Sequence, residues 1–234
     1  AFNNVRFYKS DMSGKCDSLH SSTKNELTQL IGKPVLWNNE NQMTGDIMHL
    51  IGNNETEKLD SLKVLNNAFI IQKDSLSKNG FNQMKGQNLF GRFEENKLKQ
   101  VDIIKNAESI YYIYNDKNEF VGIRKSVCSR INLEMNENKI ETMTGFNNAE
   151  SNIYPDNEFP ENARKLRGFA WRGDERILSK ENIFPEEELA IDAKVQIDAQ
   201  KKAIESDKPM EIQKETLEYD EKNPKPKDKT VKKL

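Results

Sequence analysis

An internal repeat is the feature that most constrains what this sequence can fold into. The segment ENKLKQVDIIKNAES, residues 95–109, returns 42 residues further along as ENKIETMTGFNNAES, residues 137–151, and the two agree best at their ends. A third copy runs from Lys58-Leu59 to Asn67-Ala68, and a weaker fourth begins at Asn3. A repeat of this length predicts an array of supersecondary units stacked on one another.

A shorter motif, Met-x-Gly, recurs between the copies. It occurs at Met12-Ser13-Gly14, Met43-Thr44-Gly45 and Met84-Lys85-Gly86, and Val121-Gly122 is a degenerate copy. The motif supports a repeat array, although the sequence alone gives its Met and Gly no role.

Apolar residues in the three clear copies recur at a spacing of three, which fits neither an ideal strand nor an ideal helix. The aligned positions are Leu59, Leu62, Leu65 and Ala68, then Leu98, Val101, Ile104 and Ala107, then Ile140, Met143, Phe146 and Ala149. Poor helix formers crowd the third copy: Thr142, Thr144, Gly145, Asn147 and Asn148. Each would cost a helix ~0.5 kcal/mol. Because Asn tolerates the backbone angles of a corner, we expect each unit to be a strand, a bend at the Asn pair, and a second strand.

The sequence around the repeats is typical of β-strands. Short runs rich in Val, Ile, Phe and Tyr are separated by turn signals such as Asn53-Asn54 and the polar loop 115–118. In RINLEM, Ile131, Leu133 and Met135 share one face, and polar residues share the other. We therefore expect residues 1–155 to be all-β, a repeat-built stack of antiparallel strands with one apolar and one wet face.

Composition narrows the possible partners. The chain of 234 residues has 36 basic and 38 acidic residues, so its net charge of -2 predicts no attraction to nucleic acid. Hydrophobic residues make up 35% and charged residues 32%. This apolar share is low for a domain with a single core and suits a thin, extended stack. The chain contains no apolar run long enough to span a membrane as a helix.

No residue pattern indicates catalysis, a cofactor or a metal. His20 and His49 are isolated from other metal-ligand residues, and no nucleophile or phosphate-loop motif occurs. Cys16 and Cys128 are either a disulfide or, in the plainer interpretation, two small half-buried residues. We therefore predict that the protein is not an enzyme, with no catalytic residue, no metal ligand and no cofactor.

The character of the sequence changes after Pro155. Residues 156–184 contain aromatic residues, and we expect them to form an irregular cap in which Phe169 and Trp171 cover the end of the stack. An alternative role belongs to the arginines, which could meet a phosphate or a partner's carboxylate. These arginines are Arg164, Arg167, Arg172 and Arg176.

Two further segments complete the domain organisation. Residues 185–206 predict a helix, with Pro185 in its first turn and Glu186 to Glu188 at the positive end of its dipole. Residues 207–234, with mixed charges and the run NPKPKDK, predict a charged, flexible tail. The sequence does not begin with Met, and we expect either a removed leader or an excised segment.

Three stretches resemble a known family. GKPVLWNNENQMTGD, LDSLKVLNNAFI and RKLRGFAWRGDER are similar to the OstA-like proteins of Bacteroidetes, which belong with the LptA-type and LptD N-terminal modules of lipopolysaccharide transport. The resemblance covers residues 1 to about 180, and its most specific parts are QMTGD and GFAWRGDER. The predicted helix and tail lie outside it.

The resemblance implies a β-jelly-roll, a folded V of stacked strands, in the periplasm and associated with the outer membrane. It implies that acyl chains of lipopolysaccharide (lipid A) lie between two sheets. It also implies that modules join end to end, with other lipopolysaccharide-transport β-jelly-rolls or with copies of this chain. The apolar inner-face residues expected to contact lipid are Leu62, Val64, Val101, Ile103, Ile131, Leu133, Met143 and Phe146.

Several alternatives stay open at the level of sequence. The same apolar faces could pack on each other as a closed sandwich core instead of an open trough. The chain could also be a scaffold that joins envelope proteins through unpaired sheet edges. A sugar-binding or wall-degrading β-solenoid is a third class, but the aligned repeats lack the recurring carboxylate on a wet face that it would require.

Overall fold

The computed structural model describes residues 1–38, 40–56, 58–136, 139–184 and 194–201. The chain divides into two units, Ala1–Phe184 and Pro185–Leu234. In the second unit, residues 194–201 are helical, and the rest of the predicted helix 185–206 and the predicted tail 207–234 lie outside the described residues. No helix among the described residues is long and apolar enough to cross a membrane.

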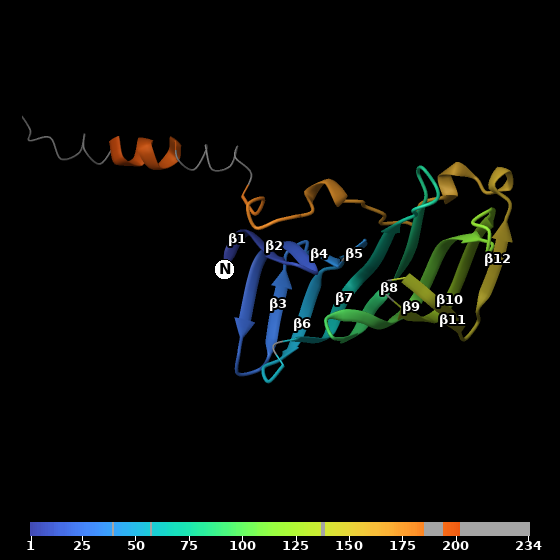
Figure 1. Cartoon of the computed structure of the whole chain (residues 1–234), viewed down its shortest axis with the longest axis horizontal. Helices are drawn as coiled ribbons and strands as arrows, with labels where there is room; N and C mark the ends of the chain where they lie inside the picture. The colour runs from blue at the N-terminus through green and yellow to red at the C-terminus, as the bar shows by residue number, and fades with distance from the viewer. Residues whose placement is uncertain (39, 57, 137–138, 185–193, 202–234) are drawn as a thin grey trace, which may run out of the picture. The chain divides into compact units, whose positions relative to one another are not determined.

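The strands between residues 2 and 154 form one antiparallel sheet (Figure 1). Its strands are β1 (Phe2–Lys9), β2 (Met12–Ser22), β3 (Leu27–Ile31), β4 (Val35–Asn38), β5 (Asn41–Thr44), β6 (Ile47–Asn53), β7 (Lys58–Lys73), β8 (Phe81–Glu94), β9 (Lys97–Tyr114), β10 (Phe120–Asn136), β11 (Lys139–Phe146) and β12 (Glu150–Tyr154). The expected all-β class, built from repeats of antiparallel strands, is confirmed by this order.

Corners at the Asn pairs fold the sheet. Each copy of the repeat has two consecutive residues with positive φ, and these pairs are Asn3-Asn4, Asn66-Asn67, Lys105-Asn106 and Asn147-Asn148. Three of the four pairs are two asparagines, a residue type that adopts the left-handed region at low cost. The predicted unit of strand, bend and strand is therefore confirmed, including the weak copy at the N-terminus.

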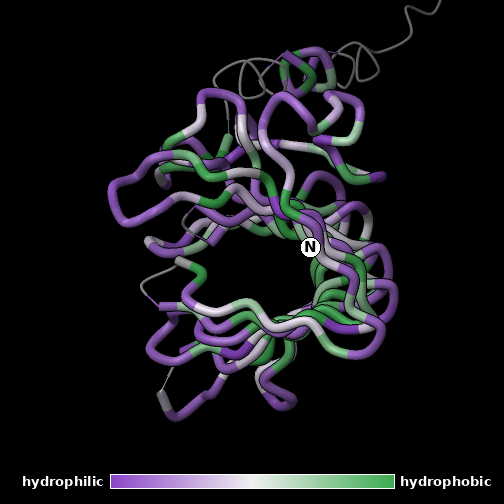
Figure 2. Tube along the Cα trace, turned by 90° about the vertical axis from the view of Figure 1, so that its right-hand side faces the viewer, coloured by the Kyte–Doolittle hydropathy of each residue, from purple (hydrophilic) through white to green (hydrophobic). Residues whose placement is uncertain are grey.

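The corners divide the sheet into two arms. The lower arm comprises residues 18–31, 47–65, 88–104, 130–136 and 139–146, and the upper arm comprises residues 5–15, 35–44, 68–86, 107–127 and 150–154. Seen along the stack, the strands superimpose as two arms that meet at one side, with hydrophobic segments on the sides that face each other (Figure 2). The expected folded V is this arrangement.

A bulge in each copy explains the first step of the three-residue spacing. Pairing registers shift beside Asp60, Lys99 and Glu141, so that one residue of each repeat is unopposed. The extra residue turns the chain over by one position. The residues three positions apart across it, such as Leu59 and Leu62, consequently both point between the arms.

The Met-x-Gly motif marks the inner side of the corner. A Cβ on Gly86 would lie 2.6 Å from Ile103 Cγ2 of the lower arm and 3.1 Å from the Ile104 carbonyl oxygen. Gly45 has the same relation to Val64. At Gly45 and Gly86 a residue without a side chain is required because a β-branched residue of the other arm occupies the space, whereas at Gly14 the ring of Phe7 on the neighbouring strand occupies it.

Residues 155–184 form a strap along the outer face of the upper arm. That face is apolar, and the strap covers it with Phe159, Leu166, Phe169 and Trp171. The expectation that the segment covers the end of the stack is wrong. Phe169 packs against Phe69 and Phe81 in the middle of the sheet, where these residues belong to the apolar cluster on the outer face of the upper arm.

Two buried glutamines hold the strap in place of a neighbouring strand. Gln83 accepts a 2.9 Å hydrogen bond from the Leu166 N–H and donates a 2.7 Å bond to the Arg164 carbonyl. Gln42 accepts from the Arg172 N–H at 2.6 Å and donates to the Ala170 carbonyl at 2.7 Å. Each side-chain amide thus satisfies one donor and one acceptor of strap backbone, as a β-ladder would.

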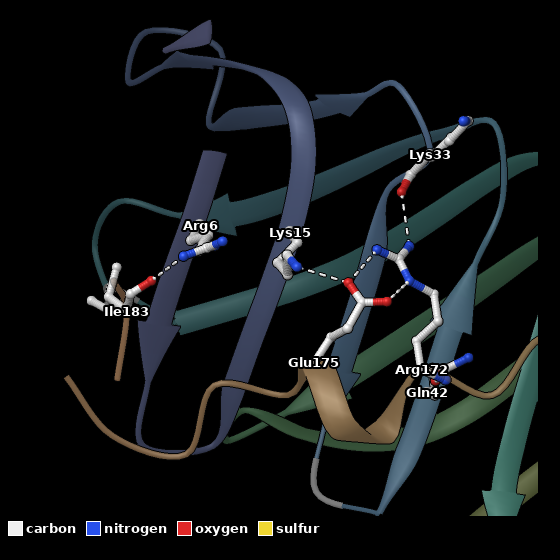
Figure 3. A network of polar contacts seen from close by, with 7 residues as sticks. All are labelled: Arg6, Lys15, Lys33, Gln42, Arg172, Glu175 and Ile183. Atoms are coloured by element: carbon white, nitrogen blue, oxygen red, sulfur yellow. Dashed lines mark hydrogen bonds and ion pairs between the residues drawn. The ribbon is translucent and has the colours of Figure 1, made fainter. Parts of the chain in front are cut away.

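Charged groups fasten the distal part of the strap (Figure 3). Glu175 lies 2.7 Å from both Arg172 Nε and Lys15 Nζ. Its hydrogen bond to Arg172, together with Lys15, lowers the pKa of Glu175 to about 2. Arg6 of β1 donates to the Ile183 carbonyl at 2.9 Å. The strap therefore reaches the first strand of the stack.

Candidate functional site

One row of inward residues crosses the lower arm from strand to strand. Leu50, Leu62, Gly91, Val101, Leu133 and Met143 are successive register partners across β6 to β11. Leu62, Val101 and Leu133 are fully buried, and Met143 packs against the same cluster. The prediction that Leu62, Val101 and Met143 occupy one inward position in successive layers is confirmed.

A second inward row lies beside the first, nearer the corner. Leu19, Leu30, Met48, Val64, Leu89, Ile103, Ile131 and Gly145 are its successive register partners. Val64 and Ile103 have no exposed surface, and Ile131 has 1%. The second row is therefore mainly aliphatic from β2 to β10, and the first runs beside it from β6 to β11 with a gap at Gly91.

Phe146 does not belong to these rows, and its placement on the inner face is wrong. It pairs with Arg130, is 40% exposed, and has the Arg130 guanidinium 5.2 Å from its ring centroid on the outer face. The alignment with Leu65 and Ile104 was correct. These three positions precede the corner and face outward, and only the residues after the corner turn inward again.

The space between the arms is closed in the middle and open at the N-terminal end. Over β7 to β10 the facing side chains pack into one buried cluster, as expected for a sandwich core. At the first layers, a pocket of about 570 Å³ lies between the arms, within the size range of small-molecule sites. Its apolar lining includes Phe7 and Met12 from the upper arm, and Leu19, Leu50 and Leu59 from the lower arm.

Methionine is concentrated between the arms. Of the chain's 7 methionines, six line this space: Met12, Met43, Met48, Met84, Met135 and Met143. Methionine is unbranched and flexible, so it refills irregular gaps and repacks at little cost. A cluster lined in this way admits rearrangement more readily than one lined by branched residues alone.

A row of buried polar residues borders the apolar rows on the upper arm. Asn38, Asn41, Gln72 and Asn82 are successive register partners, and their alternation with Leu36 and Met43 places them on the inner face. Asn38 Oδ1 and Asn41 Nδ2 have no hydrogen-bond partner among the described residues. Unpaired buried amides are rare and call for a polar ligand group or water. Sequence analysis missed this row, although the period of two from Leu36 and Met43 predicts it.

The cysteines are free thiols, and three of the four strap arginines, Arg164, Arg172 and Arg176, pair with carboxylates of the chain. Cys16 and Cys128 are free and buried, and burial raises the pKa of each thiol. Arg164 pairs with Asp156 at 2.8 Å, and Arg172 with Glu175. These arginines meet carboxylates of their own chain, so the alternative role in meeting a partner is not required of them.

A second pocket, of about 860 Å³, lies outside the corner. Its lining is polar. It includes Asp46, Asn67, Lys85 and Glu108 of the sheet and Arg167 of the strap. Lys85 and Glu108 pair with each other at 3.0 Å, and Asn67 donates to Asp46. Most of its charge is therefore satisfied internally.

Both ends of the stack carry strands with one described neighbour. At the C-terminal end, β11 and β12 each pair only with β10 among the described strands. At the N-terminal end, β1 pairs only with β2 among the described strands. Each end therefore presents backbone groups that another strand could pair with.

Comparisons with known proteins find likeness among solved structures alone. No family model matches the chain, and no curated protein matches it. A solved structure of LptH from Pseudomonas aeruginosa, described as the LptA-homologous periplasmic component of a lipopolysaccharide transport device, is similar with a TM-score of 0.46 and 14% sequence identity. The match covers 63% of this chain and 100% of that one. A likeness of this size does not establish a family.

Proposed function

We propose that this protein is a non-catalytic lipid-binding module that holds acyl chains between its two arms. The observation that carries the proposal is the pair of aliphatic rows that runs through the stack and opens into the pocket at the first layers. An acyl chain needs an elongated apolar surface without a tight site, and the two rows offer one. No residue is assigned a catalytic step.

The energetics favour such a carrier. Each CH₂ group moved out of water gains about 0.8 kcal/mol, so a chain that slides along the rows stays desolvated throughout. The closed packing over β7 to β10 has to open for a chain to pass. Met84 of β8 and Met135 of β10 lower the cost of that opening, because their side chains repack without strain.

The lipid class we propose is lipopolysaccharide, with its lipid A acyl chains between the arms, as the sequence resemblance implies. Asn38 and Asn41 of the polar row would then face the sugar or amide groups of the lipid, which supply the hydrogen-bond partners that Asn38 Oδ1 and Asn41 Nδ2 lack. This assignment places the protein in the periplasm, on a route to the outer membrane.

End-to-end assembly is the second part of the proposal. The edges of β1 at one end and of β11 and β12 at the other leave both arms open to extension by another β-jelly-roll module or by a copy of this chain. A scaffold that uses the same edges without carrying lipid is the competing function. It requires no accessible apolar space, so the test below separates the two.

A charge placed in the pocket tests the carrier. Leu19 lines the pocket and is only half-buried, so Leu19→Asp should leave the fold intact. A lone carboxylate there would lose its hydration when an acyl chain enters the pocket, which weakens binding. We expect binding of a fluorescent fatty acid and of lipopolysaccharide to fall about tenfold or more. Ile51→Asp is the matched control, because Ile51 is half-buried on the opposite face of β6 and does not line the pocket.

The deeper rows need a second pair of variants. Ile103→Asp introduces a charge into the buried row, and Ile104→Asp is its neighbour on the outer face, opposite Arg130. Folding is followed by far-ultraviolet circular dichroism, and lipid capture by native mass spectrometry of protein purified from its own envelope. If Leu19→Asp and its control bind lipid equally, and no lipid accompanies the wild-type protein, the scaffold replaces the carrier.

A further inference from the structure

An arginine lies on the inner face at the C-terminal end of the stack without a carboxylate partner. Arg124 of β10 alternates with Ser126 and Cys128, and Cys128 belongs to the buried cluster between the arms. Its Nη2 is 3.1 Å from Sδ of Met143, which comes from the lower arm. The guanidinium therefore spans the space between the arms in the last layers.

The contacts of Arg124 leave its charge unpaired. Besides the thioether of Met143, its guanidinium meets the Tyr111 ring at 5.8 Å from the centroid. Its Nε is buried without a hydrogen-bond partner, and no carboxylate among the described residues forms an ion pair with it. Arg130, on the outer face of the same strand, instead has Asp102 at 2.6 Å. Partly burying a guanidinium whose N–H donors have no acceptor costs free energy, unless a ligand supplies the acceptor.

Hydroxyl groups replace aliphatic ones beside this arginine. The inward row of the upper arm runs through Leu36, Met43, Ile70 and Met84, and then through Ser109, Ser126 and Ser151. Ser126 and Ser151 lie 2.9 Å apart at their hydroxyls. Burial raises the pKa of Tyr111, so its phenol stays protonated and remains a donor. The charge of Asp74 also raises the pKa of Tyr111, but this carboxylate already accepts hydrogen bonds from the Tyr114 hydroxyl and the Ser77 N–H.

We propose that Arg124, together with Tyr111, Ser126 and Ser151, binds the anionic head group of an amphiphile whose acyl chains lie between the arms. This inference rests on the proposed function and adds a specificity to it. The planar fork of donors on a guanidinium matches the oxygens of a phosphate or a carboxylate. The surrounding hydroxyls supply further donors, and no carboxylate competes for them. The site therefore selects anionic lipids over neutral lipids with the same chains.

Matched lipids test the selectivity. Dihexanoyl phosphatidic acid is compared with dihexanoylglycerol, and decanoate with decanol, each by titration of the full-length protein. We expect the wild-type protein to prefer the anionic member of at least one pair by about tenfold or more. Arg124→Gln should abolish that preference and leave the affinity for the neutral member unchanged. The pair that responds identifies the head group as phosphate or carboxylate.

Controls separate this inference from a structural role. Lys125→Gln removes a charge from the adjacent outward position and should leave the preference intact. Arg124→Lys keeps the charge but loses the planar fork, and we expect an intermediate preference. If Arg124→Gln lowers the melting temperature while the preference persists, the arginine is structural and the inference is overturned.

The remaining outcomes also decide the question. If Arg124→Gln does not fold, the Arg124 Nε–H resonance of wild-type protein is followed by NMR during titration with phosphatidic acid. A shift that dihexanoylglycerol does not cause supports the site, and an unmoved resonance overturns it. If wild-type protein binds neutral and anionic lipids equally, this inference fails alone. If it binds no lipid, the proposed function fails with it.

Discussion

The side-chain oxygen of Gln83, in the middle of the upper arm, accepts a 2.9 Å hydrogen bond from the backbone N–H of Leu166 in the strap. The two residues are 83 positions apart in the sequence. Gln83 has 1% of its surface exposed and also donates to the Arg164 carbonyl. One side chain therefore fixes the strap to the sheet at two backbone groups.

Replacing that side chain should release this part of the strap. Gln83→Leu leaves the Leu166 N–H and the Arg164 carbonyl buried without partners, which destabilises the protein by about 2 kcal/mol. Urea unfolding followed by tryptophan fluorescence measures the loss, and limited proteolysis should cut within residues 160–170. Gln87→Leu, at an exposed position in the corner of the same strand, should change neither.

The close approach at the corner gives a second prediction. Gly86→Ala places a Cβ 2.6 Å from Ile103 Cγ2, and a β-branched side chain cannot move aside easily. We expect a loss of about 1–3 kcal/mol in the free energy of unfolding. Gly52→Ala serves as the control because its nearest neighbours lie at 3.6 and 3.9 Å. Equal stability of the two variants would contradict the role assigned to the Met-x-Gly motif.

The positive φ angles at the corners predict which residue types these positions tolerate. Asn106 has a φ of 53°, which a β-branched residue adopts only with strain. Asn106→Val should lower stability by about 1–2 kcal/mol, and Asn106→Gly should leave it nearly unchanged. Thermal denaturation monitored by circular dichroism compares them. A valine variant as stable as the glycine variant would show that the corner does not depend on the backbone angle.

The strap should loosen in acid. The pKa of Glu175 is lowered from 4.5 to about 2, so its ion pairs stabilise the folded state above about pH 4.5, and this contribution is lost as the pH falls toward 2. Because 38% of the side chain is exposed, solvent screening limits the contribution to about 1 kcal/mol. Unfolding titrations between pH 6 and pH 2.5 should show this slope in wild-type protein and a smaller one in Glu175→Gln.

The sequence by itself determined the local architecture of the stack. Paired asparagines, repeated with their flanking residues, predicted a strand, a corner and a strand, because few residues tolerate the left-handed backbone that a corner requires. The inward row through Leu62, Val101 and Met143 followed from aligning the copies. These features depend on a residue and its near neighbours, so a single sequence specifies them.

Only the tertiary structure decided which faces met. Phe146 aligned correctly but faces outward, because it lies three positions after inward Met143 in a stretch without a bulge, where the two faces of the strand alternate. The strap crosses the outer face rather than the end of the stack, since Gln42 and Gln83 satisfy its backbone there. Arg124 became a candidate ligand group only when Met143 of the other arm was found beside it. Each of these relationships joins residues distant in sequence. A local sequence pattern does not indicate which distant segment will pack against them.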